Sequence, residues 1–342
     1  MRNLFRSTAL GVALLASTAV TASAATEVLV YTAIEADQLK AYEAALEAAH
    51  PDVDVRFVRD STGIVTAKLL AEKANPRADV VLGLAATSLM LLEKEGMLMP
   101  YAPVGLEAVK PTMRDPANPP AWVGMDVWAS AVCFNTVEGE KRELKAPTSW
   151  ADLTDPAYKG QITMPNPASS GTGYLMVSAW LQLFGEEKGW AFMDALDKNI
   201  ATYTHSGSKP CALAASGEYP IGISFEFRAA RLINQGAPLV AVIPSEGIGW
   251  DMEASAIIKG TDNEADAKKL MDWVVSDEAM KIYAKNYAIL GNAAFEEPIK
   301  NLPANLKAKL IDNKFDWAAA NRAAILQEWQ RRYDAKSEPK KG

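Results

Sequence analysis

Strand-like and helix-like segments alternate along the first part of the chain, and this alternation limits the folds that the chain can adopt. Apolar, β-branched runs predict strands, and amphipathic runs with a period near 3.6 predict helices. The strands are expected at 27–33, 53–59 and 78–84, and the helices at 35–51, 62–76 and 86–98. Since strands joined through helices pair in parallel, the pattern predicts an α/β fold with a mostly parallel sheet covered by helices.

A second set of elements follows the first. Its strands are expected at 128–136, 161–167, 220–227, 239–245 and 254–260, and its first helices at 171–184 and 186–198, with further helices toward the C-terminus. The chain has 342 residues, whereas an ordinary domain has about 100–200. Two lobes are therefore expected.

Residues 1–24 are typical of a secretory signal peptide. Arg2 and Arg6 form a basic start, an apolar stretch follows, and Ala22-Ser23-Ala24 fits the cleavage pattern of small residues. The alternative is a membrane anchor, but the apolar stretch is shorter than the ~20 residues that a spanning helix needs. We expect a chain that begins near Ala25 and is exported to the periplasm.

The composition excludes some partners. The formal net charge is −7, and removal of residues 1–24 removes two arginines and no acid. An acidic protein is a poor match for nucleic acid, whose phosphates require a basic surface. We expect no nucleic-acid partner and no cofactor.

The chain has two cysteines, Cys133 and Cys211. An oxidising exported compartment permits a disulfide between them, and two separate buried thiols are the alternative. Their spacing matches no zinc or redox motif. We also find no cluster with the spacing of metal ligands.

Hydroxyl-rich segments stand at four predicted helix starts. The N-terminus of a helix attracts oxyanions through unpaired N–H groups and a partial positive charge. Simple capping is the alternative at each start, because Ser and Thr are common N-caps. The segment 169–173 is the most specific, since it has three hydroxyls where capping needs one. The candidate oxyanion ligands are Ser61, Thr62, Thr87, Ser169, Ser170, Gly171, Thr172 and Ser206.

The sequence contains no recognisable catalytic pattern. Gly173 is followed by Tyr174 where a phosphate-binding loop requires lysine, and no G-x-S-x-G elbow is present. His50 stands at a predicted helix end, and His205 is adjacent to Ser206 but is best explained as a loop residue near a binding site. A hydrolase of phosphate or phosphonate esters is the alternative, and it lacks a nucleophile–base pair. We expect a binding protein rather than an enzyme.

Several carboxylates stand in apolar surroundings. Glu226 lies between two phenylalanines, where an unpaired charge is costly to bury, and an ion pair with Arg228 or Arg231 is the alternative explanation. Tryptophans occur near some of these acids, and acids beside aromatic rings can hold an ammonium group, although core or hinge packing is the more common role of such rings. The candidate ammonium ligands are Glu226 first, then Glu35, Asp126 and Asp251, and Tyr31 is a further contact for either end of the ligand. Glu253, in the same segment as Asp251, is not among them.

Five segments resemble one family of binding proteins. They are YTAIEADQL, RDSTGIVTAKLLAEKANPRADVVLGLAATS, NPASSGTGY, SFEFRAARLINQGAPL and DNEADAKKLMDWVVSDEAM. They are similar to the periplasmic 2-aminoethylphosphonate-binding proteins of ABC importers, which belong to a wider group similar to ferric-ion-binding proteins. Ferric-binding relatives have two adjacent tyrosines where this chain has Phe225-Glu226-Phe227. This difference argues against iron and favours an amine held by Glu226.

The resemblance implies a two-lobed periplasmic binding protein of type II. Each lobe would be a mixed sheet flanked by helices, the chain would cross between lobes near 130–136 and 244–251, and the ligand would lie in the interlobe cleft. The implied parts are lobe 1 at 25–132 plus about 251–300, lobe 2 at 133–250 and C-terminal helices at 301–334. The low-complexity composition of the C-terminal end separately predicts a disordered tail at 335–342.

The resemblance also implies a function. The protein would be a monomer that closes on 2-aminoethylphosphonate and delivers it to a membrane permease. The same role with phosphate, another phosphonate, a polyamine or ferric ion is the alternative.

Overall fold

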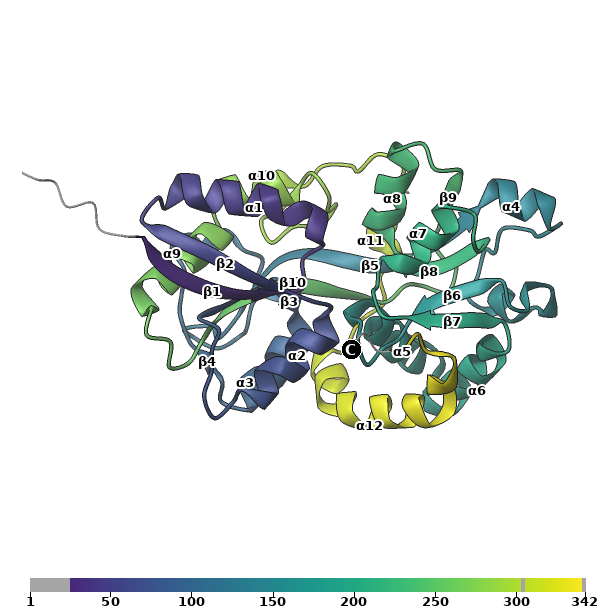
Figure 1. The fold of residues 1–342 in the computed structure, drawn as a ribbon, viewed down its shortest axis with the longest axis horizontal. Helices are drawn as coiled ribbons and strands as arrows, with labels where there is room; N and C mark the ends of the chain where they lie inside the picture. The colour runs from purple at the N-terminus through teal and green to yellow at the C-terminus, as the bar shows by residue number, and fades with distance from the viewer. Residues whose placement is uncertain (1–24, 303–304, 340–342) are drawn as a thin grey trace, which may run out of the picture.

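The computed structural model describes residues 25–302 and 305–339, so the predicted signal peptide lies outside the described residues. Two α/β lobes lie side by side and share a long path of hydrogen-bonded strands (Figure 1). The strand order is β2-β1-β3-β10-β5-β8-β6-β7, with β4 on β10 and β9 on β5. The predicted two-lobed α/β fold is confirmed.

The strands and helices are short and regular. The strands are β1 (Thr26–Thr32), β2 (Val53–Arg59), β3 (Val80–Ala85), β4 (Leu98–Met99), β5 (Val123–Asn135), β6 (Ile162–Pro165), β7 (Ile200–Thr204), β8 (Ile221–Phe225), β9 (Leu239–Val242) and β10 (Trp250–Ile258). The helices are α1 (Ala36–Ala49), α2 (Thr62–Ala71), α3 (Ala86–Lys94), α4 (Thr136–Lys141), α5 (Gly171–Phe184), α6 (Glu186–Asp197), α7 (Lys209–Ala215), α8 (Glu226–Asn234), α9 (Glu264–Val274), α10 (Asp277–Tyr283), α11 (Leu306–Lys309) and α12 (Phe315–Tyr333).

Two strands, β5 and β10, connect the lobes. The first half of β5 pairs antiparallel with β10, and its second half, from Ser130, pairs antiparallel with β8 and β9. The outer strands of each lobe are parallel, as the alternating pattern predicts: β1 pairs with β2 and β3, and β6 pairs with β7 and β8. The sheet is therefore mixed, because the chain must pass from one lobe to the other and return.

Helices cover both faces of each lobe (Figure 1). In the first lobe α1, α9 and α10 pack together on one face and α2 and α3 on the other. In the second lobe α7 and α8 lie on one face and α5 and α6 on the other. The long α12 packs against α3 of the first lobe and α5 of the second, so the C-terminal helix bridges both. Among the described residues, every helix is too short or too polar to span a membrane.

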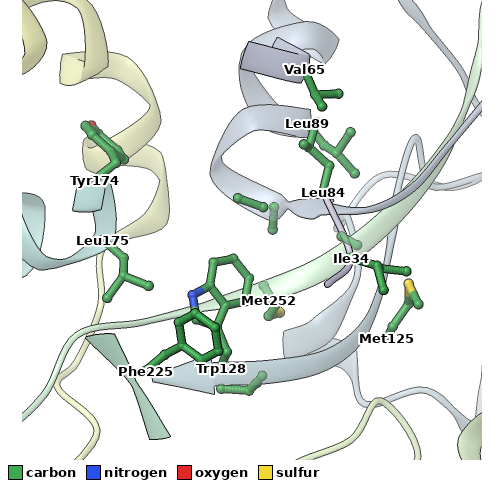
Figure 2. Packing of buried hydrophobic residues seen from close by; sticks show 14 of the residues in the cluster. Ile34, Val65, Leu84, Leu89, Met125, Trp128, Tyr174, Leu175, Phe225 and Met252 are labelled. Carbon is green, nitrogen blue, oxygen red and sulfur yellow. The ribbon is translucent and has the colours of Figure 1, made fainter. Parts of the chain in front are cut away.

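The core continues from one lobe into the other. Every residue of β3 and of β5 is buried, which matches their apolar sequences. Figure 2 shows Trp128 on β5 where the strand passes between lobes, with Phe225, Met252 and Leu175 around it. The core is therefore continuous across the strands that connect the two lobes.

The C-terminal tail differs from its prediction. Residues expected at the start of a disordered tail form a short 3₁₀ turn, Asp334–Lys336, and then pack on the second lobe. The N–H of Glu338 donates to the carbonyl of Tyr203 at 2.9 Å, and Asn166 Nδ2 donates to Ser337 Oγ at 2.8 Å. Composition predicted disorder wrongly for 335–339, because polar tail residues find polar partners on β7 and its neighbouring loops.

The structure joins Cys133 and Cys211 in a disulfide, with Cα atoms 5.4 Å apart. Cys133 lies on β5 and Cys211 on α7, which packs over that strand. The disulfide thus links a helix of the second lobe to a crossing strand. Of the two alternatives that the sequence left open, a disulfide or two separate thiols, the structure shows the disulfide.

Candidate functional site

A small cavity of about 40 Å³ lies between the lobes, at the carboxyl ends of strands from both. This is the edge at which open α/β sheets bind ligands. The cavity is lined by Glu35, Arg59, Ser61 and Thr62 from the first lobe, by Ser170, Gly171, Thr172, Gly207, Phe225 and Phe227 from the second, and by Trp128 and Glu253 from the crossing strands. Five of the eight predicted oxyanion ligands therefore meet at one place.

Two helix starts face each other across this cavity, those of α2 and α5. The N–H of Gly63 in α2 donates to the carbonyl of Ser169, 2.8 Å away in the other lobe. Gly171 permits this approach, because a Cβ atom there would lie 2.6 Å from Thr62 Oγ1. Each helix leaves its first N–H groups without intrahelical partners and carries partial positive charge at this end. The arrangement suits a compact oxyanion.

Arg59 adds a full positive charge and was not predicted. It is the last residue of β2, its Nε donates to the carbonyl of Ile34 at 3.0 Å, and its Nη2 lies 3.7 Å from Glu35 Oε1. A guanidinium held in this way offers its remaining donors to a phosphate-like group. The signal that could have revealed Arg59 is its position directly before the hydroxyl-rich start of α2.

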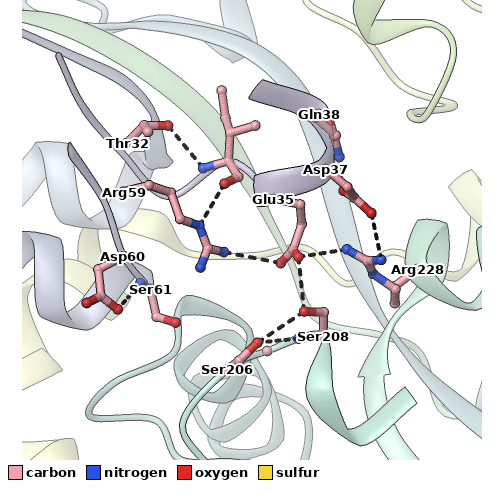
Figure 3. Close-up of polar contacts among 12 residues, drawn as sticks. Thr32, Glu35, Asp37, Gln38, Arg59, Asp60, Ser61, Ser206, Ser208 and Arg228 are labelled. Carbon is pink, nitrogen blue, oxygen red and sulfur yellow. Dashed lines mark hydrogen bonds and ion pairs between the residues drawn. The ribbon is translucent and has the colours of Figure 1, made fainter. Parts of the chain in front are cut away.

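Glu35 lies at the cavity, but other partners hold its carboxylate (Figure 3). Its Oε2 accepts from Arg228 Nη2 at 2.7 Å and from Ser208 Oγ at 3.0 Å, both in the second lobe. Arg228 also pairs with Asp37 at 3.1 Å. Because guanidinium groups already neutralise Glu35, little of its charge remains for a ligand ammonium. We define Glu35, Asp37, Arg228 and Ser208 as the interlobe latch.

We expect Arg228→Ala to weaken ligand binding without a direct contact to ligand. Only the closed lobes form the latch, so its loss favours the open state, and a partly buried ion pair of this kind contributes about 1 kcal/mol, or about fivefold in Kd. Small-angle scattering of the ligand-free variant should show a larger radius of gyration. Arg231→Ala is the matched control. Arg231 also contacts Asp37 at 3.1 Å, but its side chain is more exposed than that of Arg228, so we expect a smaller effect. Unchanged affinity and shape for Arg228→Ala would show that the latch does not bias closure.

Glu253 is the second acidic residue on the cavity wall, beside Glu35, and it was not among the predicted ligands. It lies on β10 directly opposite Asp126 on β5. Burial raises the pKa of Glu253 to about 8, although Tyr287 and Arg59 act in the opposite direction. Burial, together with Glu253 and Glu226, raises the pKa of Asp126 well above its usual range. Asp126, a predicted ammonium ligand, is fully buried behind the cavity rather than on its wall.

Glu226, the first predicted ammonium ligand, lies close to this group but not on the cavity wall. It is the first residue of α8 rather than the end of a strand, and its Oε2 accepts from the N–H of Ala129 at 2.7 Å. Burial raises its pKa to about 8. The suggested ion pair with Arg228 or Arg231 is wrong, because both arginines extend to Asp37 on α1.

Three other predicted contacts are directed elsewhere. Thr87 Oγ1 donates to Asp251 Oδ2 at 2.7 Å, so these two satisfy each other, and burial raises the pKa of Asp251 only to about 6. The Tyr31 hydroxyl donates to Glu72 at 3.0 Å. Thr87, Asp251 and Tyr31 are therefore all absent from the cavity wall, and each forms a hydrogen bond with another side chain instead.

Ser169 and Ser206 lie on a neighbouring cavity of about 790 Å³. Ser169 Oγ donates to the carbonyl of His205 at 2.9 Å, and Ser206 Oγ lies 3.0 Å from Ser208 Oγ. This larger cavity shares Arg59 and Ser61 with the small one. The two serines therefore lie next to the small cavity, on the side of the C-terminal tail, and do not line it.

Within residues 25–302 and 305–339, no cluster of three or more His, Cys, Asp or Glu side chains could hold a metal ion. The cavity wall of the described chain carries the donors of Arg59 and of two helix starts, together with the carboxyl groups of Glu35 and Glu253.

Comparisons with known proteins identify the family of the chain. A family model described as bacterial extracellular solute-binding protein matches residues 75–323. An uncharacterized protein of Haemophilus influenzae is 33% identical over 286 residues, 81% of this chain and 82% of that protein. A probable ABC transporter periplasmic-binding protein of Sinorhizobium fredii is 28% identical over 84% of this chain and 79% of its own length.

A more distant relative and a solved structure concern the ligand. A putative 2-aminoethylphosphonate-binding periplasmic protein of Salmonella paratyphi A is 25% identical over 66% of this chain and 66% of its own length. The periplasmic binding protein AfuA of Actinobacillus pleuropneumoniae, solved with fructose-6-phosphate bound, superposes with a TM-score of 0.84 at 30% identity and covers 90% of this chain and 99% of its own.

Proposed function

Because the chain belongs to the family of bacterial extracellular solute-binding proteins, we propose that it captures 2-aminoethylphosphonate for an ABC importer. The protein is a periplasmic solute-binding component of such an importer, and family members are substrate-binding transport proteins rather than enzymes. In the proposal, ligand binding draws the two lobes together, and the closed form presents the ligand to the membrane permease.

One observation carries the choice of ligand: the small cavity has an oxyanion-binding side and a carboxyl side. On the first are Arg59 and the starts of α2 and α5, and on the second is Glu253. Trp128 and the Phe225 and Phe227 rings complete the wall, and aromatic faces also favour an ammonium group. A short zwitterion with an oxyanion at one end and an ammonium at the other matches both sides.

The relatives support the oxyanion half of the proposal. One is a putative 2-aminoethylphosphonate-binding protein, and a structural neighbour was solved with a sugar phosphate. Both ligands carry a tetrahedral phosphorus oxyanion, which helix N-termini bind well. The carboxyl half rests on Glu253 of this chain, because a sugar phosphate has no cation for it.

A sugar phosphate is the second candidate. The larger cavity next to the site shares Arg59 and Ser61 and is lined by hydrogen-bonding groups such as Asn166 and His205. A phosphate at the helix starts could extend its sugar in that direction. The small volume of the main cavity, about 40 Å³, favours the shorter ligand.

Calorimetric titration of the ligand-free protein tests the proposal. The ligands are 2-aminoethylphosphonate, ethylphosphonate, inorganic phosphate and fructose 6-phosphate. Tight binding of the first and at least tenfold weaker binding of the second supports both sides of the site. Equal binding of the first two contradicts the carboxyl side, and preference for fructose 6-phosphate favours the second candidate.

We expect Glu253→Gln to reduce affinity for 2-aminoethylphosphonate by about 30-fold or more at pH 8, because loss of one partner of a buried charge pair costs about 2–5 kcal/mol. Affinity for ethylphosphonate should change less than about threefold. Asp251→Asn is the matched control, since Asp251 is equally buried on the same strand but bonds to Thr87 outside the cavity. A similar loss for both ligands would exclude an ammonium contact at Glu253.

A further inference from the structure

Two carboxyl groups stand directly opposite each other beneath the site. Asp126 on β5 and Glu253 on β10 are register partners in an antiparallel pair, so their side chains extend from the same face of the sheet, with Cβ atoms about 5 Å apart. Asp126 is 0% exposed and Glu253 is 8% exposed. Among the described residues, neither oxygen of Asp126 has a hydrogen-bond partner, and Glu253 Oε2 has none.

The surroundings do not neutralise this carboxyl pair. The groups that act on it are Glu226 from α8, Glu35 from the start of α1, Arg59 from β2, and the hydroxyls of Tyr42, Tyr283 and Tyr287. Arg59 is the cation of this set, and it already lies near Glu35. Two further acids, Glu226 and Glu35, offset its charge, and the phenols are neutral, so the net surroundings do not stabilise two carboxylates.

Two adjacent negative charges in a dry site repel strongly, and like charges directly opposite in a sheet are destabilising. Each carboxyl also loses its hydration on burial, which favours the protonated form. Both effects raise the pKa values of Asp126 and Glu253. The ligand-free pair therefore retains protons at neutral pH, and a carboxyl that is protonated cannot form an ion pair with a ligand.

We propose that the Asp126–Glu253 pair releases a proton when the ammonium group of the ligand binds at Glu253, so that capture of the amine is coupled to proton release. The inference rests on the proposed function, because it requires an amine-bearing ligand. The released proton passes to the solvent, and Glu253 becomes the carboxylate partner of the ammonium. Asp126 keeps its proton, so the site never holds two bare negative charges.

The coupling has a definite sign. The ligand-free pKa of Glu253 is raised to about 8, and a bound ammonium lowers it, so binding favours the deprotonated state. Affinity for the amine should therefore rise with pH below about pH 8, by at most about tenfold per pH unit for one proton, and become flat above it. Ethylphosphonate has no ammonium group and cannot draw a proton from Glu253. The phosphonates of the two ligands titrate at different pH, because the ammonium group of 2-aminoethylphosphonate lowers the second pKa of its phosphonate. The comparison that isolates the carboxyl pair is therefore the same ligand on the wild-type protein and on Glu253→Gln.

The test is calorimetric titration of the full mature protein between pH 6 and 9, in two buffers of different ionisation enthalpy at each pH. The difference in apparent enthalpy gives the protons released per ligand bound. We expect 2-aminoethylphosphonate to release up to about one proton more from the wild-type protein than from Glu253→Gln at pH 7, and about none more above pH 9. Equal proton release from the two proteins at pH 7 would overturn the inference and leave the proposed function intact. Failure of 2-aminoethylphosphonate to bind at any pH would overturn the proposed function and the inference with it.

Variants and spectroscopy assign the proton to this pair. Asp251→Asn is the matched control, and it should release as many protons as the wild-type protein when 2-aminoethylphosphonate binds. A second measurement needs no variant: the infrared band of a protonated carboxylic acid should weaken in the wild-type protein when 2-aminoethylphosphonate binds and remain when ethylphosphonate binds. An unchanged band with both ligands would contradict proton release by a carboxyl.

Discussion

Replacing Arg59 with glutamine is expected to weaken 2-aminoethylphosphonate binding by about 100-fold. Arg59 supplies the full positive charge beside the two helix starts, and it is oriented by the carbonyl of Ile34. The Arg59 side chain is 26% exposed, and a hydrogen bond from such a partly buried charged group to an oxyanion contributes about 1.5–3 kcal/mol, where 1.4 kcal/mol is tenfold in Kd. Ethylphosphonate should lose the same factor, since the contact is to the oxyanion shared by both ligands.

Arg56→Gln is the matched control for Arg59→Gln. Arg56 lies on the same strand three residues earlier, but its side chain is 59% exposed and pairs with Asp54 on the surface. We expect unchanged affinity for this variant. Calorimetry on both variants, with thermal unfolding to verify the fold, gives the comparison. If Arg59→Gln bound as tightly as Arg56→Gln, the oxyanion would have to lie elsewhere in the cleft.

Removing the disulfide is expected to lower the free energy of unfolding by about 4 kcal/mol. The bond closes a loop with a sequence separation of 78 residues, and the entropy of the unfolded chain rises when a loop of this length is released. The variant is the double substitution Cys133→Ala and Cys211→Ala, and the measurement is urea denaturation. Ligand affinity should change little, because neither cysteine lines the cavity.

Wild-type protein under reducing conditions is the control for this variant. It loses the cross-link and retains the buried sulfur atoms, so the two should agree if the cross-link is responsible. A loss below about 1 kcal/mol in both would show that the bond adds little to stability. A loss in the double variant alone would assign the effect to packing in the buried cluster around Cys133 and Cys211.

The sequence predicted most elements because their signals are local. The strand at 53–59 agrees with β2 to the residue, and the glycine-rich start of α5 agrees as well. β7 and the two-residue β4 were missed, since short strands carry little periodic signal. Position 226 was misplaced: an apolar run leads into it, and only the structure shows that the strand ends at Phe225 and that Glu226 begins α8.

The oxyanion side of the site was largely predictable, and the carboxyl side was not. Hydroxyls and glycines at helix starts form a local pattern, and parallel strands bring such starts to one edge of the sheet. Which carboxylate faces the cavity depends on pairing between distant segments. Glu35 meets Arg228 193 positions away, and Thr87 meets Asp251 164 positions away, so two predicted ammonium ligands already have partners.

The sequence by itself determined the alternation of strands and helices and the helix starts that suit an oxyanion, because these follow from periodicity, caps and turn residues over short windows. The two lobes were indicated by the length of the chain and by the family resemblance. The tertiary structure alone decided that Glu253 lines the cavity, that Asp126 stands opposite it and that Glu35 belongs to the interlobe latch. The register of β5 against β10 and the contact between lobes set these positions. The physical reason is that burial and charge pairing depend on tertiary contacts, which bring together residues that are far apart in the chain.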